Sequence, residues 1–271
     1  LNWYVPSWCS RGYVEAYMDS LFVRGCSAET VATRLRGLQQ FFKYLVEEGD
    51  ITEAPTARVK MPVLPEKPVP VVPADAMQRL YKSLAGAGYE ERRDLAILRL
   101  FVDTGVRLEE LTRLGVEDVD FNVDVITVLG KGRRVRTVGF GDATAQALER
   151  YLKVRETHPR ARRRFQGDDE DPRNGKRPLW LGTRGRDAMM PSVVRQMVWR
   201  RTEFVFGAEG RLYPHQLRHT AAHEHAEAGL SETDLMRLFG WKSDKMPKRY
   251  GASAAHERAL QAKRRLMGGR D

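Results

Sequence analysis

Four of the six histidines of the chain lie within thirteen residues, in the stretch "YPHQLRHTAAHEH" at 213–225. His219 and His223 are four residues apart, so on a helix they would share one face, a spacing that can bind zinc. The stretch lacks the His-Glu-x-x-His pattern of zinc enzymes, however, and helical geometry turns His225 about 200° away from His223. We therefore expect no metal site.

The same stretch contains a pair of residues suited to binding an anion. His215 and Arg218 in "HQLRH" are one helical turn apart and so face the same way. Arg107 and Glu110 in "TGVRLEEL" have the same spacing and could form an ion pair. Taken singly, these residues do not identify a site: an ordinary salt bridge explains Arg107 and Glu110 better than a catalytic role does, and Lys131 between two glycines is most often a solvated turn residue.

Taken together, the motifs form an ordered set. "TGVRLEEL" is followed by "LGKGRRVRTVGF", then by "HQLRHTAA" and "LFGWKSDKMPKRYG". The set resembles the motifs of tyrosine recombinases, the phage-integrase family, in which a His or Trp lies nine residues before a nucleophilic tyrosine. Here Trp241 lies nine residues before Tyr250. The resemblance covers roughly residues 75–260.

The resemblance implies a reaction in which Tyr250 attacks a DNA phosphodiester, giving a 3′-phosphotyrosyl intermediate and a free 5′-hydroxyl. Negative charge then grows on the phosphate oxygens, and Arg107 and Arg218 would stabilise it, because planar guanidinium groups match those oxygens. A tyrosine hydroxyl has a pKa of about 10 and needs a base near neutrality. His215 is the residue expected to act as that base.

The other residues of the set would assist. Lys131, at the tip of a hairpin, would protonate the departing 5′-oxygen. Trp241 has a single N–H donor, so it could only hydrogen-bond and pack. Glu110 and His219 are expected to support their neighbours rather than react. The resemblance implies no metal, ATP or other cofactor, because the arginines neutralise the charge and the phosphotyrosyl bond retains the energy of the phosphodiester.

The composition agrees with an anionic partner. The chain has 46 Lys and Arg against 36 Asp and Glu, which gives a formal net charge of +10 and a pI near 9.7. Nucleic acid is the commonest partner of such basic proteins. The residues expected to contact DNA are Arg34, Arg36, Lys43, Arg133 and Arg134.

Five prolines in "MPVLPEKPVPVVPAD" (61–75) predict an extended connector between two domains. We expect a helical core DNA-binding domain at 1–65, a proline-rich linker at 66–74, and a catalytic domain at 75–271 that ends in a tail helix. The expected fold class is mainly α with a small antiparallel β-sheet: an α-helical domain followed by a mixed α+β catalytic domain of the tyrosine recombinase type.

Apolar residues that recur every three or four positions predict helices, with Ser27 capping one start and Gly105 one end. The expected helices span 10–25, 27–49, 75–88, 91–105, 107–114, 142–156 and 191–207, with more after 213. Alternation around the Gly-Lys-Gly tip predicts a β-hairpin at 124–140. A charged loop is expected at 158–178 and a short strand at 179–183.

The function expected is that of a site-specific DNA recombinase or integrase serving a mobile genetic element. A type IB topoisomerase-like enzyme and a zinc-dependent nuclease are the alternatives. The expected partners are a double-stranded recombination site and further copies of the chain, as a dimer on one site and a tetramer in synapsis. The chain shows neither a membrane-spanning apolar run nor the start of a signal peptide, so we expect a cytoplasmic protein encoded by a bacterium or a phage.

Overall fold

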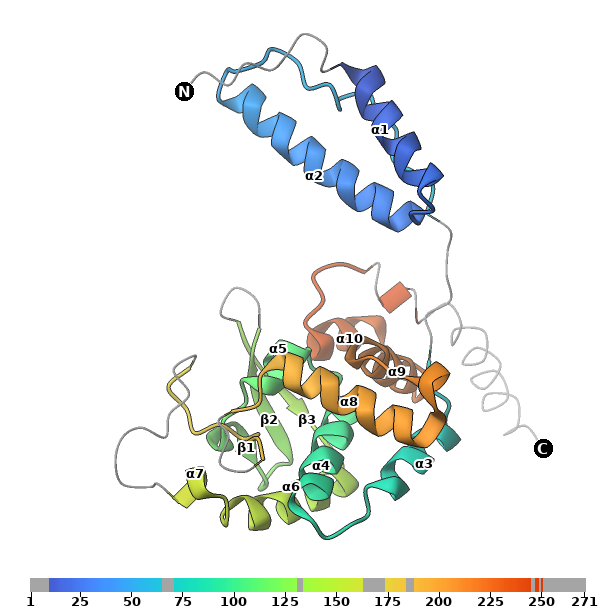
Figure 1. The fold of residues 1–271 in the computed structure, drawn as a ribbon. Coiled ribbons are helices and arrows are strands. Elements are labelled where there is room, and N and C mark those ends of the chain that lie inside the picture. Colours follow the sequence, from blue (N-terminus) through green and yellow to red (C-terminus); the bar gives the residue numbers. More distant parts are fainter. Residues whose placement is uncertain are drawn as a thin grey trace, which may run out of the picture. The chain divides into compact units, whose positions relative to one another are not determined.

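The structure is a computed structural model, and it describes residues 10–64, 71–130, 134–162, 174–183, 188–244, 247–248 and 250, with the backbone only at 160 and 162. The chain divides into two compact units, Leu1–Pro68 and Val69–Asp271 (Figure 1). Each unit has its own hydrophobic core. None of the helices described is both long and apolar enough to cross a bilayer.

The first unit is built on two helices, α1 (Arg11–Val23) and α2 (Ala28–Glu47), which pack against each other. The Ser27 hydroxyl accepts a hydrogen bond from the N–H of Thr30 at 3.3 Å, which confirms the predicted N-cap. The apolar faces of the helices form the core with one residue from the following segment. Its buried residues are Val14, Met18, Leu21, Val31, Leu35, Phe42, Leu45 and Val59.

The second unit is organised around α4 (Tyr89–Thr104), which contributes nine buried residues and contacts both α6 (Asp142–Arg155) and α9 (Pro214–Glu227). The other long helices are α3 (Ala74–Ser83), α8 (Pro191–Phe206) and α10 (Glu232–Phe239). As predicted, α4 ends at Gly105, which has a left-handed φ of 55°. A Cβ atom there would lie 2.2 Å from Cε1 of Phe239, so this turn requires glycine.

A small antiparallel sheet lies beside these helices, as the mainly α fold class predicts (Figure 1). It contains β1 (Val119–Asp120), β2 (Val125–Leu129) and β3 (Val135–Gly139) in that order. Leu129 pairs with Val135 and Val125 with Gly139, so β2 and β3 form the predicted hairpin. The two-residue strand β1 was not predicted, because it is too short to show an alternating pattern.

Two expected elements differ in the structure. Residues 179–183 do not form a strand: Leu181 makes only an isolated bridge with Ala188. The reason is that the segment runs into the core, where the buried indole N–H of Trp180 donates to the carbonyl of Leu111 at 2.9 Å. The loop expected at 158–178 begins with a short helix, α7 (Pro159–Arg162).

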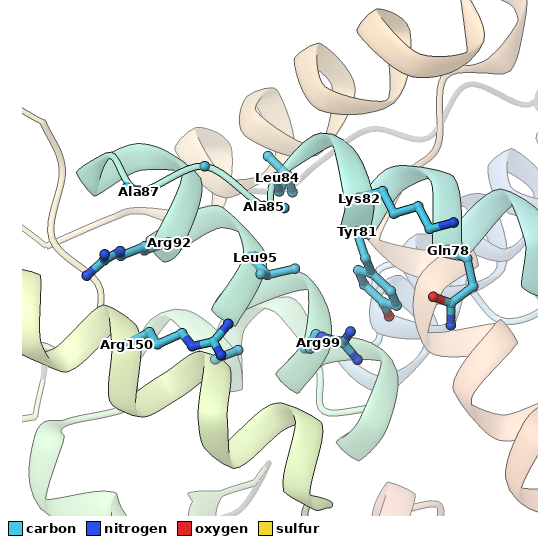
Figure 2. Close-up of a pocket in the computed structure, with 12 residues that line it drawn as sticks. Gln78, Tyr81, Lys82, Leu84, Ala85, Ala87, Arg92, Leu95, Arg99 and Arg150 are labelled. Carbon is cyan, nitrogen blue, oxygen red and sulfur yellow. The ribbon is translucent and has the colours of Figure 1, made fainter.

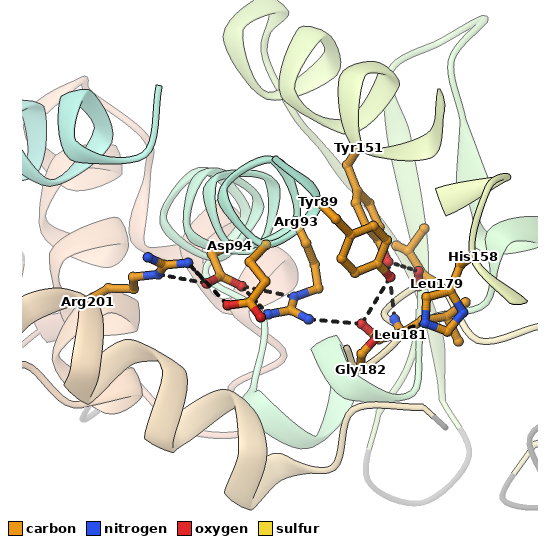
Figure 3. Close-up of polar contacts among 10 residues, drawn as sticks. Tyr89, Arg93, Asp94, Tyr151, His158, Leu179, Leu181, Gly182 and Arg201 are labelled. Atoms are coloured by element: carbon orange, nitrogen blue, oxygen red, sulfur yellow. Dashed lines mark hydrogen bonds and ion pairs between the residues drawn. The ribbon is translucent and has the colours of Figure 1, made fainter. Parts of the chain in front are cut away.

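Buried polar side chains fix this segment against the helices (Figure 3). The hydroxyl of Tyr151 donates to the carbonyl of Leu179 at 3.0 Å and accepts the N–H of Leu181 at 3.1 Å. His158 Nε2 lies 2.9 Å from the carbonyl oxygen of Gly182. Because these bonds satisfy backbone groups that no strand partner reaches, the segment can be buried without joining the sheet.

Asp94 lies at the centre of the charged part of this network (Figure 3). Its Oδ1 accepts from Nε and Nη2 of Arg93 at 2.9 and 2.8 Å, and its Oδ2 accepts from Nε of Arg201 at 2.8 Å. The side chains of Asp94 and Arg93 are only 1% and 3% exposed. The two arginine charges are thus balanced by one buried carboxylate that joins α4 to α8.

The Asp94→Asn variant should lose about 3–5 kcal/mol of unfolding free energy, because it leaves a buried guanidinium without its counter-charge. Urea unfolding followed by circular dichroism measures this loss. The matched control is Glu203→Gln, which breaks the exposed pair with Arg211 and should cost less than about 1 kcal/mol. Equal losses in the two variants would contradict the role given to Asp94.

Candidate active site

One pocket of the second unit gathers most of the residues that the sequence motifs single out. It has a volume of about 450 Å³ and lies where α9, the start of α5 (Leu108–Thr112) and the segment after α10 meet. Six of those residues line it: Arg107, His215, Arg218, His219, Trp241 and Tyr250.

The start of α9 decides how its residues face the pocket. Pro214 occupies the first helical position, where its missing N–H costs nothing. His215 follows and is exposed, whereas Arg218, one turn later, is buried. The His215 and His219 rings meet edge to face with their centroids 4.1 Å apart. The helix therefore presents one imidazole at the surface and a guanidinium inside the pocket.

The Arg218 guanidinium is held from two sides. It donates to the carbonyl oxygens of Gly105 and Phe239, and its Cζ lies 5.1 Å from the centre of the Phe239 ring. Burial, and then the nearby positive charge of Arg107, lower the pKa of Arg218 to about 9. The group is still protonated near neutrality, and a phosphate in the pocket would offset the unfavourable burial of its charge.

Arg107 pairs with Glu110, as their spacing predicts, but it precedes α5 instead of lying on a face of it. Glu110 Oε1 accepts from Nη1 of Arg107 at 3.0 Å, and Oε2 accepts from the backbone N–H of Arg107 at 2.8 Å. The carboxylate thus caps the first turn of α5 and orients the arginine at once. The Arg107 side chain remains 37% exposed, so it is available to a ligand in the pocket.

Arg136 on β3 also pairs with Glu110, so the carboxylate is shared by two arginines. The sequence motifs did not single out Arg136. Its Nη1 and Nη2 donate to Oε1 and Oε2 of Glu110 at 2.9 and 2.8 Å. Burial alone would raise the pKa of the Glu110 carboxyl, but the hydrogen bonds and charges of Arg136 and Arg107 bring it down to about 2. A signal for Arg136 was present in the strand alternation, since it shares a face with buried Val138.

Three arginines converge on the C-terminal end of α10. The successive carbonyl oxygens of Leu238–Gly240 each accept one guanidinium hydrogen bond, and we call these residues the arginine-capped turn. The donors, in order, are Arg136 Nε at 2.8 Å, Arg218 Nη2 at 2.7 Å and Arg107 Nη2 at 3.0 Å. Carbonyl groups at a helix end lack partners within the helix and attract positive charge. Gly240 has a φ of 62°, and a Cβ atom there would lie 3.3 Å from Nη1 of Arg136.

Tyr250 is packed into the same pocket and is only 2% exposed. Its ring stacks on that of Trp241 at 5.7 Å, with an interplanar angle of 4°, and Phe239 extends the stack at 4.8 Å from Trp241. On another side, the His219 ring lies 5.6 Å from the Tyr250 ring. The phenol is therefore positioned by the arginine-capped turn on one side and by α9 on the other.

The basic residues expected at the hairpin tip are only partly described. Lys131 and Arg133 lie outside the described residues. Arg134 is exposed, and its carbonyl oxygen accepts the N–H of Gly130 at 2.8 Å, which closes the described part of the hairpin. Arg136 lies on β3, one of the two strands of the hairpin, and its bonds to Glu110 attach the base of the hairpin to the start of α5.

The three DNA-contact residues expected in the first unit lie on α2 and are exposed. They are Arg34, Arg36 and Lys43. Arg34 Nη1 donates to the hydroxyl of Tyr17 at 3.2 Å, and Lys43 Nζ lies 3.5 Å from a carboxylate oxygen of Glu47. All three remain available to an external anion on the surface of their own unit.

The two remaining histidines of α9 have neighbours of their own. His223 Nε2 lies 3.1 Å from a carboxylate oxygen of Glu227, and His225 Nδ1 lies 2.7 Å from the carbonyl oxygen of Ala221. The four histidines of the stretch thus divide into two near the pocket and two along the helix. No group of three or more metal-ligating side chains is gathered among the residues that the structure describes.

A separate hollow of about 410 Å³ lies between α3, α4 and α6 and is basic (Figure 2). Its lining includes no acidic residue and carries four cations: Lys82, Arg92, Arg99 and Arg150. The Arg99 guanidinium lies over the Tyr81 ring, 4.4 Å from its centre. Part of the positive charge of the chain therefore lies on a concave surface that shares no lining residue with the active-site pocket.

The described lining of the active-site pocket combines three guanidinium groups, two imidazoles and two phenols; Arg195 on α8, which the sequence motifs did not single out, is the third arginine, and Tyr213 is the second tyrosine. Guanidinium groups with fixed partners suit an oxyanion whose charge increases during a reaction. A phenol next to imidazoles suits a nucleophile that must lose a proton. The pocket therefore fits attack by Tyr250 on a bound phosphate ester.

The comparisons with known proteins point in the same direction. The sequence profile described as the phage integrase family matches residues 70–257. The chain is 31% identical over 231 residues to the tyrosine recombinase XerC of Thermodesulfovibrio yellowstonii, with 85% of this chain and 73% of that protein aligned.

Two solved structures share the fold. The XerH site-specific recombinase, in a post-cleavage complex with its difH substrate, has a TM-score of 0.74 and 17% identity over 94% of this chain and 72% of that one. The Tn1549 transposon integrase, in complex with circular intermediate DNA, has a TM-score of 0.71 and 21% identity over 92% of this chain and 84% of that one.

Proposed function

The chain belongs to the phage integrase family and is a tyrosine recombinase, a site-specific DNA-recombining enzyme, and we propose that Tyr250 is its nucleophile. The observation that carries this proposal is the position of Tyr250. Its ring packs against Trp241 and His219 in the pocket that Arg107 and Arg218 line. A bound phosphate would thus meet the phenol and both guanidinium groups together.

The proposed cleavage step assigns a role to each of these residues and to Lys131, which lies outside the described residues. The Tyr250 oxygen attacks the phosphorus, and the bond to the 5′-oxygen breaks, which leaves a 3′-phosphotyrosyl link. The phenol proton passes to the His215–His219 pair, with His215 as the base. Arg107 and Arg218 bind the phosphate oxygens as their charge grows, and Lys131 supplies the proton to the departing 5′-oxygen. Rejoining is the reverse attack by a 5′-hydroxyl, so the reaction needs no energy cofactor.

A covalent-capture experiment tests this proposal. The protein is incubated with fragmented duplex DNA in EDTA, denatured in SDS, and the attached DNA is sequenced to identify the target. A substrate nicked next to that target should then trap an SDS-stable adduct, because the short 5′-hydroxyl fragment diffuses away. Failure to form any adduct contradicts the mechanism, and DNA cleavage that occurs without an adduct and that EDTA abolishes favours the zinc-dependent alternative.

Strand exchange separates the recombinase from the topoisomerase alternative. The protein is supplied either with two copies of its target on separate duplexes or with supercoiled plasmid that lacks the target. We expect exchange in the first reaction and no relaxation in the second. Relaxation of any plasmid without exchange would instead identify a topoisomerase-like activity.

The domain roles and the assembly are part of the proposal. The first unit serves as the core DNA-binding domain, which is supported by the exposed cations on α2. Exchange between two duplexes cuts four strands, so it requires four copies if each supplies one Tyr250. Two copies on one site and four in synapsis follow from this count. The sequence of the captured DNA tests whether the target belongs to a mobile element.

Replacing Lys131 should affect cleavage in a way that depends on the leaving group. Lys131→Ala is expected to slow cleavage of a normal 5′-oxygen by about 100-fold, because the leaving oxygen then departs without a proton donor. A substrate with sulfur in the bridging position needs no such donor, so its cleavage should be nearly unaffected. Cleavage rates on the two substrates measure the difference, and equal slowing would contradict the role.

A further inference from the structure

We propose that Arg136 is a positioning residue that couples the β2–β3 hairpin to the arginine-capped turn and, through Glu110, fixes Arg107 relative to that turn. This inference rests on the proposed function, because the turn leads to Trp241 and the hairpin carries Lys131. Arg136 does not line the active-site pocket. Its effect on the reaction must therefore be transmitted through the groups that it contacts.

The contacts of Arg136 join three elements at once. Both of its Nη atoms donate to Glu110 at the start of α5, at 2.8–2.9 Å, and its Nε donates to the carbonyl oxygen of Leu238 at 2.8 Å. The side chain itself comes from β3, and it is 14% exposed. Each of its three nitrogens thus donates to a group inside the protein, which is the arrangement of a side chain that holds other elements together and not of a DNA-binding arginine.

Glu110 links Arg136 to Arg107, so a carboxylate that Arg136 holds in place also orients Arg107. Its carboxylate is 5% exposed and accepts hydrogen bonds from Arg136 and from the side chain and backbone N–H of Arg107. Without Arg136, the Glu110 carboxylate would still bond Arg107 but would itself no longer be held by a second guanidinium. Because small displacements of catalytic groups have large kinetic effects, a loss of about 10- to 100-fold in rate is expected.

Two glycines show how closely the elements approach Arg136. A Cβ atom on Gly130 would lie 3.4 Å from its Nη1, and one on Gly240 would lie 3.3 Å from the same atom. Gly130 directly follows Leu129, the last residue of β2, and Gly240 belongs to the arginine-capped turn. The guanidinium therefore fills the space between the two segments, so neither can shift far without displacing it.

The first test compares Arg136→Gln and Arg136→Lys with wild-type protein in single-turnover cleavage of the nicked substrate. Both variants should cleave about 10- to 100-fold more slowly, with DNA affinity changed by less than about threefold. Lysine keeps the charge, but its three donors share one nitrogen, so it cannot bond both Glu110 oxygens side by side and also reach the Leu238 carbonyl as the planar guanidinium does. A wild-type rate for Arg136→Lys would overturn the coupling and leave a simple charge effect. The matched control is Arg177→Gln, which breaks the Arg177–Glu117 pair outside the pocket and should leave the rate unchanged.

The dependence on pH provides a readout that a general loss of stability would not move. The charged groups facing the Glu110 carboxyl are Arg136 and Arg107 in contact, and Arg218 at longer range. Burial raises the pKa of Glu110, and Arg136 and Arg107 lower it. Removal of Arg136 takes away one of the two lowering charges, so the pKa of Glu110 should rise. The ratio of the Arg136→Gln rate to the wild-type rate should therefore fall as the pH is lowered from about 8 to about 5. A constant ratio would contradict the inference.

Hydrogen exchange tests the coupling without any reaction. In Arg136→Gln, amides of β3 and the amide of Trp241, which is bonded to the Met236 carbonyl at 3.0 Å, should lose protection together. In Arg177→Gln neither should change. Loss at β3 alone would overturn the coupling. If wild-type protein forms no adduct but the exchange result holds, the proposed function fails while the coupling between hairpin and turn stands.

Discussion

A Tyr250→Phe variant should bind its target DNA as wild-type protein does but form no covalent adduct. The change removes one oxygen atom and keeps the ring, so the stack with Trp241 and the contact with His219 are retained. Because the 3′-phosphotyrosyl bond needs that oxygen, the loss should be complete and not graded. The measurement is the fraction of labelled nicked substrate that migrates with the protein in SDS.

Tyr213→Phe is the informative companion to this experiment. Tyr213 is the other tyrosine lining the same pocket, and it is 50% exposed. If it were the nucleophile, its variant and not Tyr250→Phe would lose the adduct. An adduct that persists in Tyr250→Phe and disappears in Tyr213→Phe would reassign the reaction, whereas persistence in both would point to a different nucleophile.

The second large effect is expected at Arg218. Arg218→Lys keeps a positive charge on α9 but loses the planar fork that could hold two phosphate oxygens while still bonding Phe239. Loss of one donor to a developing oxyanion commonly slows an enzyme by about 10²–10³-fold. We expect a decrease of that size in the single-turnover cleavage rate, with DNA affinity lowered by less than about tenfold.

The control for Arg218→Lys is Arg237→Lys on the outer face of α10. Arg237 is 77% exposed and pairs with nearby Asp234, so its replacement should change the rate by less than about twofold. Unfolding of each variant in urea is measured alongside. If the Arg218→Lys rate falls only in proportion to stability or to DNA binding, Arg218 holds the fold and does not stabilise the transition state.

The sequence predicted most helices and the hairpin, because their apolar spacing and caps are local signals. Ser27 and Gly105 mark helix ends by their own chemistry, so their roles could be read without a structure. The conformation of the segment 179–183 could not be predicted in this way. Its apolar pattern is that of a strand, and only the distant groups on Leu111 and Tyr151 make an unpaired backbone acceptable in the core.

In the active site too, some residues could be predicted from the sequence and others depend on contacts between distant segments. The order and spacing of the motifs singled out six of the twelve residues that line the pocket, but not Arg195. They gave no sign of Arg136, whose importance depends on Glu110 and on the end of α10, 102 residues away from it in the sequence. They also could not place His219 against Tyr250, because the path of the chain after α10 decides that contact.

The arginine-capped turn also bears on how tightly this enzyme can hold DNA. Long arginine side chains in solution adopt many rotamers, and binding normally costs about 0.5–1.5 kcal/mol for each one that it immobilises. In the free protein, Arg107 and Arg218 are already held by the carbonyl oxygens of Gly240 and Phe239. Much of that conformational entropy is therefore lost during folding, and a phosphate entering the pocket finds a rigid receptor instead of two flexible side chains.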